Sequence, residues 1–428
     1  MPILAAMSEA LRPRVVAEGG PWVALGPAEP PEAPEPAGPA TPLAGPLTGV
    51  VVAVKDLIAV RGLPRGAGSR TRAGAPPEPE DAAVVAAVRA AGGVVAGTVA
   101  LHELAFGVSG INDEVGFPAN PHDASRIPGG SSSGSAVAVA DGSADLALGT
   151  DTGGSVRIPA ALCGVVGFKP AYGALPLAGA LPLAPSLDHV GLLARSVGEV
   201  ARAYAALTGV GPEPGAGGRR LRLAVDRVAL DAAEPSVRAA IDAALDTLTG
   251  AGPGEGADLV DLAEVAGAGW PSTDEGFDVS TTIMFAEAAQ VHAALMASPA
   301  AARLGAPVAA RLEAGAAIAA ADLAAARERA ARIATGVRAT LRRVDAVVGP
   351  TVRVTAPLID DARRDPDLAR VLVADTRLAN VTGLPALTIP VPGAAGALPV
   401  GLQVQAGSAG TALAVGAALA GRLAGADG

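Results

Sequence analysis

Valine-rich runs alternate with longer alanine-rich segments along most of this chain. The run at residues 50–54 ends at Lys55 and predicts a buried strand, because it is short and β-branched. Apolar residues at helical spacing follow at 81–91, and a second valine-rich run occupies 94–99. Other segments predict helices at 235–248, 285–295 and 320–343, and strands at 344–348, 386–389 and 400–404. This alternation predicts a single α/β domain.

Changes in composition divide that domain into parts. Residues 1–18 carry apolar and polar side chains at helical spacing, so an N-terminal helix is predicted within a segment 1–25. Closely spaced prolines predict an extended connector at 26–46. The remaining parts are a core at 47–233, a helix-rich insertion at 234–343 and a C-terminal part of the core at 344–428.

Composition and charge narrow the classes of function. Half of the residues are hydrophobic but only 2% are aromatic, so a platform for stacking nucleic-acid bases is not expected. The formal net charge of −10 also disfavours direct contact with nucleic acid. Residues 1–16 show no apolar stretch typical of a secretory signal, and runs such as 412–421 are far shorter than the roughly 20 residues that span a bilayer. We therefore expect a cytoplasmic protein with no membrane contact.

Lysine is scarce in this sequence. Of the 32 basic residues, only Lys55 and Lys169 are lysines. Arginine replaces lysine well as a solvated charge but not as a base, because guanidinium keeps its proton in proteins. The two lysines are therefore either chance survivors of a coding bias or positions that need a neutral amine.

A Gly/Ser-rich stretch holds the candidate chemistry. It contains Gly-Gly-Ser-Ser-Ser-Gly-Ser at 129–135 and Thr-Asp-Thr-Gly-Gly-Ser-Val-Arg-Ile-Pro at 150–159. Three interpretations compete for it: a structural turn, a phosphate cradle and a nucleophilic serine. Neither Walker nor GxGxxG spacing is present, which argues against the phosphate cradle. A strand, a tight turn and a helix would leave backbone N–H groups unpaired, and these could bind a developing oxyanion.

A nucleophilic serine needs a base, and most candidate residues for that base can be excluded. Ser155 lies in Gly-Gly-Ser-Val-Arg rather than in a Gly-x-Ser-x-Gly elbow, and the segment from His102 is not an HExxH zinc motif. We expect all four histidines to be structural or surface residues: His102, His122, His189 and His292. Cys163 is the only cysteine and lies among apolar residues, so we expect buried filler and neither a disulfide nor a thiolate metal cluster. A lysine remains as the base, and no metal or other cofactor is implied.

The sequence resembles a known family at these positions. Residues 128–170, from Pro-Gly-Gly-Ser-Ser-Ser-Gly-Ser to Gly-Phe-Lys-Pro, are similar to the characteristic stretch of the amidase signature family. Shorter similarities occur at 49–56, 185–191, 380–386 and 398–403. The resemblance implies a central mixed β-sheet covered by helices on both faces, with the insertion on the substrate side.

The resemblance also implies catalytic roles. The nucleophile of the family corresponds to Ser155, and its bridging serine, which follows a cis peptide bond, corresponds to Ser131. The base of the family corresponds to Lys55. Besides the nucleophile, the implied oxyanion donors are the backbone N–H groups of Thr152, Gly153 and Gly154.

We therefore expect an amidohydrolase that converts a small or medium carboxylic amide to a carboxylate and ammonia or an amine. Two alternatives stay open. One is an amidotransferase A-type subunit that supplies ammonia for aminoacyl-tRNA amidation with a partner, and the other is a non-catalytic binding protein on the same fold. The expected ligand is a small-molecule amide, and a homodimer is left open.

Other residues are expected to support or shape the site. Asp151 and Arg157 should brace the serine loop, and Lys169 should be structural because one base is enough. The substrate pocket should be lined by 104–110, by 181–187 and by the insertion. Nothing in these segments is decisively charged or aromatic, which favours an apolar or compact acyl group.

Overall fold

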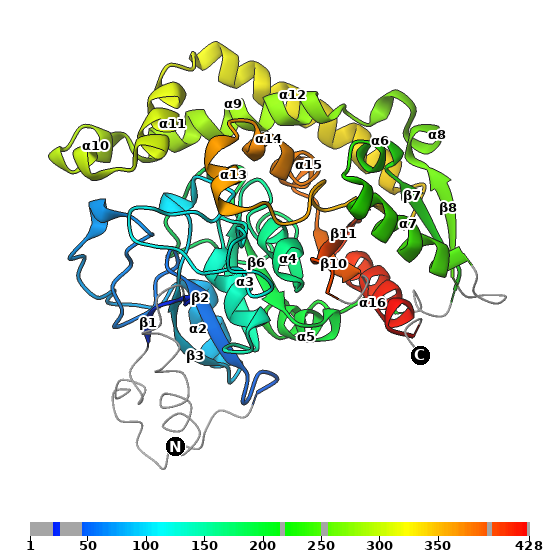
Figure 1. The fold of residues 1–428 in the computed structure, drawn as a ribbon, viewed down its shortest axis with the longest axis horizontal. Coiled ribbons are helices and arrows are strands. Elements are labelled where there is room, and N and C mark those ends of the chain that lie inside the picture. The colour runs from blue at the N-terminus through cyan, green and yellow to red at the C-terminus, as the bar shows by residue number, and fades with distance from the viewer. Residues whose placement is uncertain (1–19, 26–44, 215–218, 250–255, 392–395, 426–428) are drawn as a thin grey trace.

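A computed structural model describes residues 20–25, 45–214, 219–249, 256–391 and 396–425 of the chain (Figure 1). The helix expected at 1–18 and most of the connector expected at 26–46 lie outside these residues. Within the described ranges, no helix combines the length and the apolar character needed to cross a bilayer.

The described residues form one mixed sheet of 11 strands. In spatial order they are β1 (Trp22–Leu25), β3 (Val94–Val99), β2 (Val51–Lys55), β4 (Leu146–Asp151), β6 (His189–Ala194), β5 (Val166–Lys169), β10 (Ala386–Val391), β11 (Val400–Gln405), β9 (Ala346–Pro350), β7 (Leu221–Val225) and β8 (Ala257–Asp261). β2 runs parallel to β3 and β4, and β7 runs parallel to β8 and β9. The strands between β4 and β9 pair antiparallel with their neighbours. This arrangement confirms the expected mixed sheet.

The end of the segment 1–25 is a strand and not a helix. β1 pairs antiparallel with β3 and forms one edge of the sheet. Trp22 is buried there, and its indole N–H donates to Ser143 Oγ at 3.0 Å. Burial of this large ring against the sheet edge explains why four residues are enough for a strand here.

Helices pack on both faces of the sheet. Their bounds are α2 (Ala83–Ala90), α3 (Ser133–Ala140), α4 (Arg157–Cys163), α5 (Val197–Thr208), α6 (Arg227–Asp231), α7 (Pro235–Thr249), α8 (Leu262–Ala266), α9 (Thr273–Val291), α10 (Ala293–Met296), α11 (Ala306–Ala316), α12 (Ala320–Leu341), α13 (Ile359–Arg364), α14 (Leu368–Val373), α15 (Arg377–Thr382) and α16 (Ala409–Gly425). Val52 and Val54 of β2 pack in a cluster with α2, α5, α7 and α16, whereas Ala53 packs with α3 and α4. Successive side chains of a strand point to opposite faces, so these helices cover opposite faces.

The insertion expected at 234–343 begins with elements that belong to the sheet. Val237, Ile241 and Leu245 of α7 lie in the same cluster as the central strands, and β8 pairs with β7. The helix-rich part proper follows β8. Its long helices α9, α11 and α12 pack together in a separate cluster and run along the top of the molecule in Figure 1.

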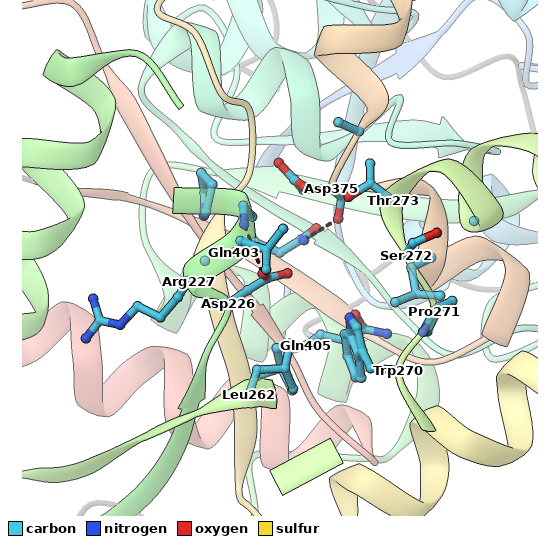
Figure 2. Close-up of a pocket in the computed structure, with 18 of the residues that line it drawn as sticks. Asp226, Arg227, Leu262, Trp270, Pro271, Ser272, Thr273, Asp375, Gln403 and Gln405 are labelled. Carbon is cyan, nitrogen blue, oxygen red and sulfur yellow. Dashed lines mark hydrogen bonds between the residues drawn. The ribbon is translucent and has the colours of Figure 1, made fainter. Parts of the chain in front are cut away.

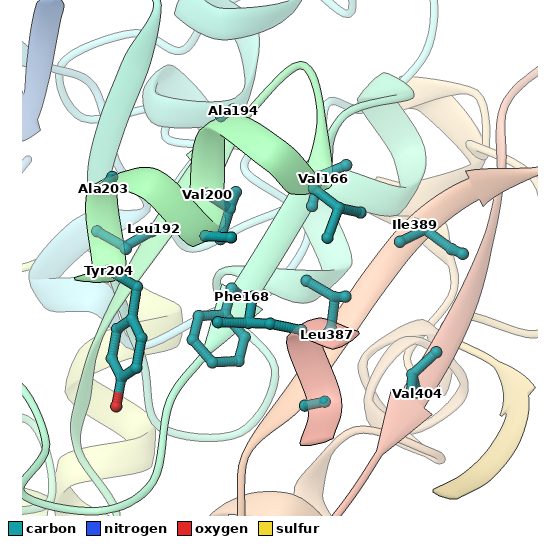
Figure 3. Packing of buried hydrophobic residues seen from close by; sticks show 14 of the residues in the cluster. Val166, Phe168, Leu192, Ala194, Val200, Ala203, Tyr204, Leu387, Ile389 and Val404 are labelled. Carbon is teal, nitrogen blue, oxygen red and sulfur yellow. The ribbon is translucent and has the colours of Figure 1, made fainter. Parts of the chain in front are cut away.

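The centre of the sheet is packed by aliphatic side chains around two aromatic rings (Figure 3). Phe168 of β5 is fully buried, and its ring meets that of Tyr204 of α5 edge to face, with centroids 5.2 Å apart. Leu192 and Leu387 belong to the same cluster. The chain has few aromatic residues, so these two rings fill space in the core that the smaller side chains of alanine and valine would leave empty.

Replacement of Phe168 should therefore lower stability strongly. We expect Phe168→Ala to reduce the free energy of unfolding by about 3–5 kcal/mol, because it removes apolar surface and leaves a cavity. Val228→Ala is the control, since Val228 is 69% exposed and its loss should change stability by less than about 0.5 kcal/mol. Denaturant unfolding followed by circular dichroism measures both. Equal midpoints for the two variants would contradict this packing.

Candidate active site

The candidate residues meet at one edge of the sheet because of the strand order. Lys55 is the last residue of β2 and Asp151 is the last residue of β4. The two strands are parallel neighbours, so their carboxyl ends lie together. Ser131 lies just before α3, and Ser155 lies in the turn between β4 and α4.

Lys55 lies fully buried between two hydroxyl groups. Its Nζ is 2.7 Å from Ser131 Oγ and 2.7 Å from Thr150 Oγ1. Burial lowers the pKa of Lys55 to about 7, although the carboxylates of Asp151 and Asp188 act in the opposite direction. A large fraction of this amine is therefore neutral near pH 7, which is the state a base requires.

The two serines are held next to each other through the backbone. The Gly130–Ser131 peptide bond is cis, as the resemblance implies. The N–H of Ser132 donates to the carbonyl of Ser155 at 3.1 Å, which ties the start of α3 to the turn. Ser155 is 5% exposed and lines a cavity, and its Oγ forms no hydrogen bond with any described residue. Its hydroxyl is thus free to meet a ligand.

The turn after β4 presents backbone donors, but not all of those expected. The N–H of Gly154 already donates to Asp151 Oδ1 at 2.8 Å. The N–H groups of Thr152, Gly153 and Ser155 have no such partner among the described residues. Gly154 has φ of 124°, and a Cβ there would lie 2.2 Å from Thr376 Oγ1, so the position accepts only glycine.

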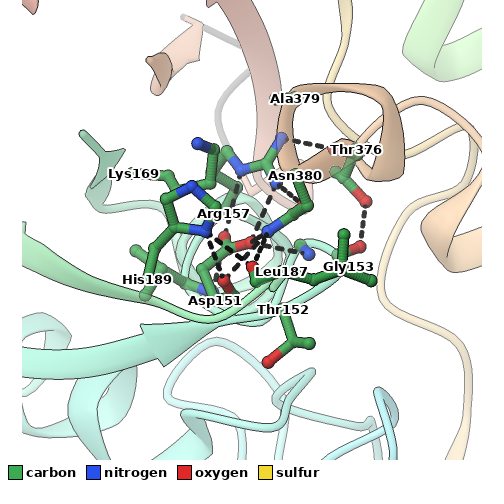
Figure 4. Close-up of polar contacts among 12 residues, drawn as sticks. Asp151, Thr152, Gly153, Arg157, Lys169, Leu187, His189, Thr376, Ala379 and Asn380 are labelled. Carbon is green, nitrogen blue, oxygen red and sulfur yellow. Dashed lines mark hydrogen bonds and ion pairs between the residues drawn. The ribbon is translucent and has the colours of Figure 1, made fainter. Parts of the chain in front are cut away.

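A buried ion pair holds this turn, as expected (Figure 4). Asp151 and Arg157 both have fully buried side chains, and two nitrogens of the guanidinium donate to the carboxylate at 2.9 and 3.1 Å. Arg157 also donates to Asn380 Oδ1, to Gln403 Oε1 and to the carbonyl of Thr376. The ion pair therefore connects the serine turn to the C-terminal part of the sheet.

The surroundings of the ion pair lower the pKa values of two buried groups, Asp151 and Lys169. Burial by itself would raise the pKa of Asp151, but the Arg157 guanidinium, Lys169 and the Asn380 amide hold it well below its usual value. Lys169 is fully buried, and burial followed by repulsion from Arg157 lowers its pKa well below the ordinary value. Its Nζ donates to the carbonyl of Pro170 at 3.0 Å, consistent with a structural role.

The four histidines and Cys163 were expected to take no part in the chemistry. None of the four histidines, all of them in the described part of the chain, hydrogen-bonds Ser155. Burial lowers the pKa of His102 and of His189 to about 3, so both rings are neutral at neutral pH. Cys163 is buried, and burial raises the pKa of its thiol. Within the described ranges, no group of three or more His, Cys, Asp or Glu residues is arranged to hold a metal ion.

A cavity of about 120 Å³ opens onto Ser155. Its walls come from 105–108, from Leu183 and from α9, which agrees with the segments expected from the sequence. The expectation of an uncharged, non-aromatic lining was wrong. Three aromatic rings and two guanidinium groups contribute: Phe106, Phe277, Phe285, Arg311 and Arg377. Arg377 lies outside every segment that was expected to line the pocket.

A larger cavity of about 350 Å³ lies apart from the serine (Figure 2). Asp226, Trp270 and Gln405 are among its lining residues, and Ser155, Ser131 and Lys55 are not. Because Ser155 lines the smaller cavity and not this one, we assign the chemistry to the smaller cavity.

Comparison with known proteins places the chain in a family. The amidase family model matches residues 35–411. The A-type subunit of the glutamyl-tRNA(Gln) amidotransferase of Anaeromyxobacter dehalogenans (strain 2CP-C) is 37% identical over 394 residues, which are 84% of this chain and 79% of that protein. Indoleacetamide hydrolase of Pseudomonas syringae pv. syringae is 48% identical over 163 residues, 38% of this chain and 36% of that protein. A crystal structure of an amidase superposes with a TM-score of 0.79 at 34% identity, and the match covers 89% of this chain and 86% of that one.

Loss of the buried guanidinium should destabilise the protein. We expect Arg157→Met to lower the free energy of unfolding by about 3–5 kcal/mol, because Asp151 would be left as an uncompensated buried charge. Arg195→Met is the matched control, since the Arg195 side chain is 45% exposed in its pair with Asp145 and should contribute less than about 1 kcal/mol. Thermal and denaturant unfolding of both variants test this, and equal stability of Arg157→Met and the unmodified protein would contradict it.

Proposed function

Because this chain belongs to the amidase family of hydrolases that act on carbon–nitrogen bonds, we propose that it hydrolyses a small or medium carboxylic amide through an acyl-enzyme on Ser155. The observation that carries the proposal is the 2.7 Å contact between Ser131 Oγ and a buried Lys55 whose pKa is about 7. This pair supplies a proton acceptor beside the turn that bears the nucleophile. No cofactor is required by these steps.

Acylation begins with proton transfer along the two serines. Neutral Lys55 accepts the hydroxyl proton of Ser131, and Ser131 accepts that of Ser155 as its Oγ attacks the amide carbon. The carbonyl oxygen then gains negative charge, and backbone N–H groups of the turn stabilise it. We assign this role to Thr152, Gly153 and Ser155, since the N–H of Gly154 is engaged by Asp151. The leaving nitrogen takes the proton back through Ser131, and ammonia or an amine departs.

Deacylation uses the same groups in reverse. Water loses one proton to the relay and attacks the ester carbon, and the relay returns that proton to Ser155 Oγ as the ester bond breaks. The carboxylic acid product loses its remaining proton to solvent or to the released nitrogen. Each cycle consumes one water and leaves the charges of the relay unchanged. The stiff Asp151–Arg157 pair keeps the turn in one geometry, which favours attack at a fixed distance.

A second candidate function is glutamine hydrolysis as an amidotransferase A-type subunit. It is supported by the 37% identity to the A-type subunit of the Anaeromyxobacter dehalogenans enzyme over 79% of that protein. In that case the chain would require partner subunits and would release ammonia to them. Glutaminase activity that rises strongly on addition of the partner subunits would favour this candidate, and efficient hydrolysis of other amides by the chain alone would favour the first.

Covalent labelling tests the nucleophile and excludes a binding-only protein. We expect a fluorophosphonate to label the native protein stoichiometrically and to leave Ser155→Ala unlabelled, because Ser155 alone, among the described residues that line the cavity, has a free hydroxyl. Ser133→Ala is the control within the same stretch, since Ser133 is buried with an unpartnered Oγ. Mass spectrometry of intact protein measures the adduct. Labelling of Ser155→Ala at the native rate would refute the assignment.

The pH dependence of labelling tests the base. Since only the neutral amine accepts a proton, the rate should fall about tenfold per pH unit below pH about 7 and level off above it. Lys55→Arg should be slower by at least about 10²-fold at every pH, because guanidinium keeps its proton. Stopped-flow labelling from about pH 5 to about pH 9 covers both sides of the Lys55 pKa and provides the profile. An unchanged profile in Lys55→Arg would remove Lys55 as the base.

A further inference from the structure

Two guanidinium groups line the cavity that opens onto Ser155, and their environment points to an anion. Arg311 comes from α11 and Arg377 from the start of α15. Arg311 donates from Nη1 to the carbonyl of Phe106, and its guanidinium lies 5.8 Å from the centre of the Phe106 ring. Arg377 is 9% exposed, so it is nine-tenths buried.

Arg377 has only neutral partners. Its Nη1 donates to Ser280 Oγ at 3.0 Å and to Thr281 Oγ1, and its guanidinium lies 4.5 Å from the centre of the Phe277 ring. Its Nε is buried with no hydrogen-bond partner among the described residues. Burial, followed by repulsion from Arg311 and Arg370, lowers its pKa to about 10, so it still carries a charge at neutral pH.

An unpaired buried cation is unfavourable unless something else compensates it. No described carboxylate forms an ion pair with Arg377 or Arg311. By contrast, Arg370 reaches the same Phe277 ring from outside the cavity and pairs with Asp274 at 2.6 Å. The difference between these arginines indicates that the counter-charge of Arg377 arrives with a ligand.

Arg377 lies close to the turn at which the amide bond of a substrate would be cleaved. A Cβ built on Gly153 would lie 3.6 Å from Arg377 Nε, so the guanidinium lies directly beside the turn that carries the oxyanion donors. Thr376 Oγ1 donates to the carbonyl of Gly153 at 2.7 Å and fixes this approach. A group held by Arg377 would therefore lie beside the turn that carries Ser155 and in the same cavity.

We propose that the substrate is a compact amide that carries a carboxylate on its acyl part, and that Arg377 binds this carboxylate. The proposal rests on the amidase function proposed above and specifies its substrate class. Guanidinium suits a carboxylate because it offers paired N–H donors in one plane. The cavity of about 120 Å³ has room for an acyl chain of a few carbons and for little more.

The same cavity disfavours a zwitterionic substrate. No aspartate or glutamate is among its described lining residues, so an ammonium group would face two guanidiniums without a counter-charge. Half-amides of short dicarboxylic acids meet the requirement, whereas glutamine adds an ammonium group to the same skeleton. The preferred reaction is therefore a half-amide monoanion and water giving a dicarboxylate and ammonium.

Matched substrate pairs test the proposal by turnover. Succinamate and butyramide differ by a carboxylate in place of a methyl group, and glutaramate and pentanamide differ in the same way. We expect kcat/KM for each half-amide to exceed that of its neutral partner by about 10- to 100-fold, mainly through KM. We expect glutaramate to be a better substrate than glutamine. Arg377→Gln should remove the preference, whereas Arg370→Gln should retain it because Arg370 lies outside the cavity.

Binding to Ser155→Ala separates this inference from the catalytic one. Calorimetry should show tighter binding of glutaramate than of pentanamide, and the additional Arg377→Gln substitution should abolish the difference. Binding preference without turnover in the unmodified protein would refute the amidase mechanism but support the anion site. Equal binding and equal turnover of the paired amides would refute the anion site alone. If Arg377→Gln slows neutral and anionic amides equally in kcat, Arg377 acts on the oxyanion and the proposal fails.

Discussion

The buried ion pair between Asp151 and Arg157 is the interaction on which the arrangement of the site depends. One residue ends β4 and the other begins α4, so the pair closes the turn that carries Ser155. The remaining donors of Arg157 reach Gln403 and Asn380, some 220 or more residues further along the chain. Removing both charges from water is unfavourable, and only the complete set of hydrogen bonds compensates for it. The turn is thus rigid because distant parts of the chain complete it.

Neutral lysine is the second constraint. Lys55 and Lys169 are both fully buried, and both have a lowered pKa. In a chain whose other basic residues are all arginines, lysine occurs at only two positions, both fully buried, and at Lys55 a guanidinium could not act as a base. Two explanations for the scarcity of lysine were left open: chance survival of a coding bias, or positions that need a neutral amine. The burial and lowered pKa of both lysines favour the second.

Strands could be predicted from the sequence where the local hydrophobic pattern agrees with the burial that the fold imposes. The strand ending at Lys55 and the strands near 94–99 and 400–404 occur within a residue or two of their expected bounds, because β-branched runs are both extended and buried. The short β8 was missed, since Ala257–Asp261 forms a strand only by pairing with β7. The charged lining of the cavity was also missed. Arg377 lies before Asn380 in a segment with no charge pattern of its own, and only the fold brings it beside Gly153.

The buried amine of Lys55 opposes the stability of the fold that positions it. Its pKa falls from 10.5 in the unfolded chain to about 7 in the folded protein, so at intermediate pH the unfolded chain binds the extra proton. The resulting loss of stability is complete below pH about 7 and disappears as the pH rises towards 10.5. An apolar side chain of similar length would avoid it altogether. The apolar packing of valine and alanine around β2 therefore compensates for a buried lysine that by itself lowers the stability of the fold.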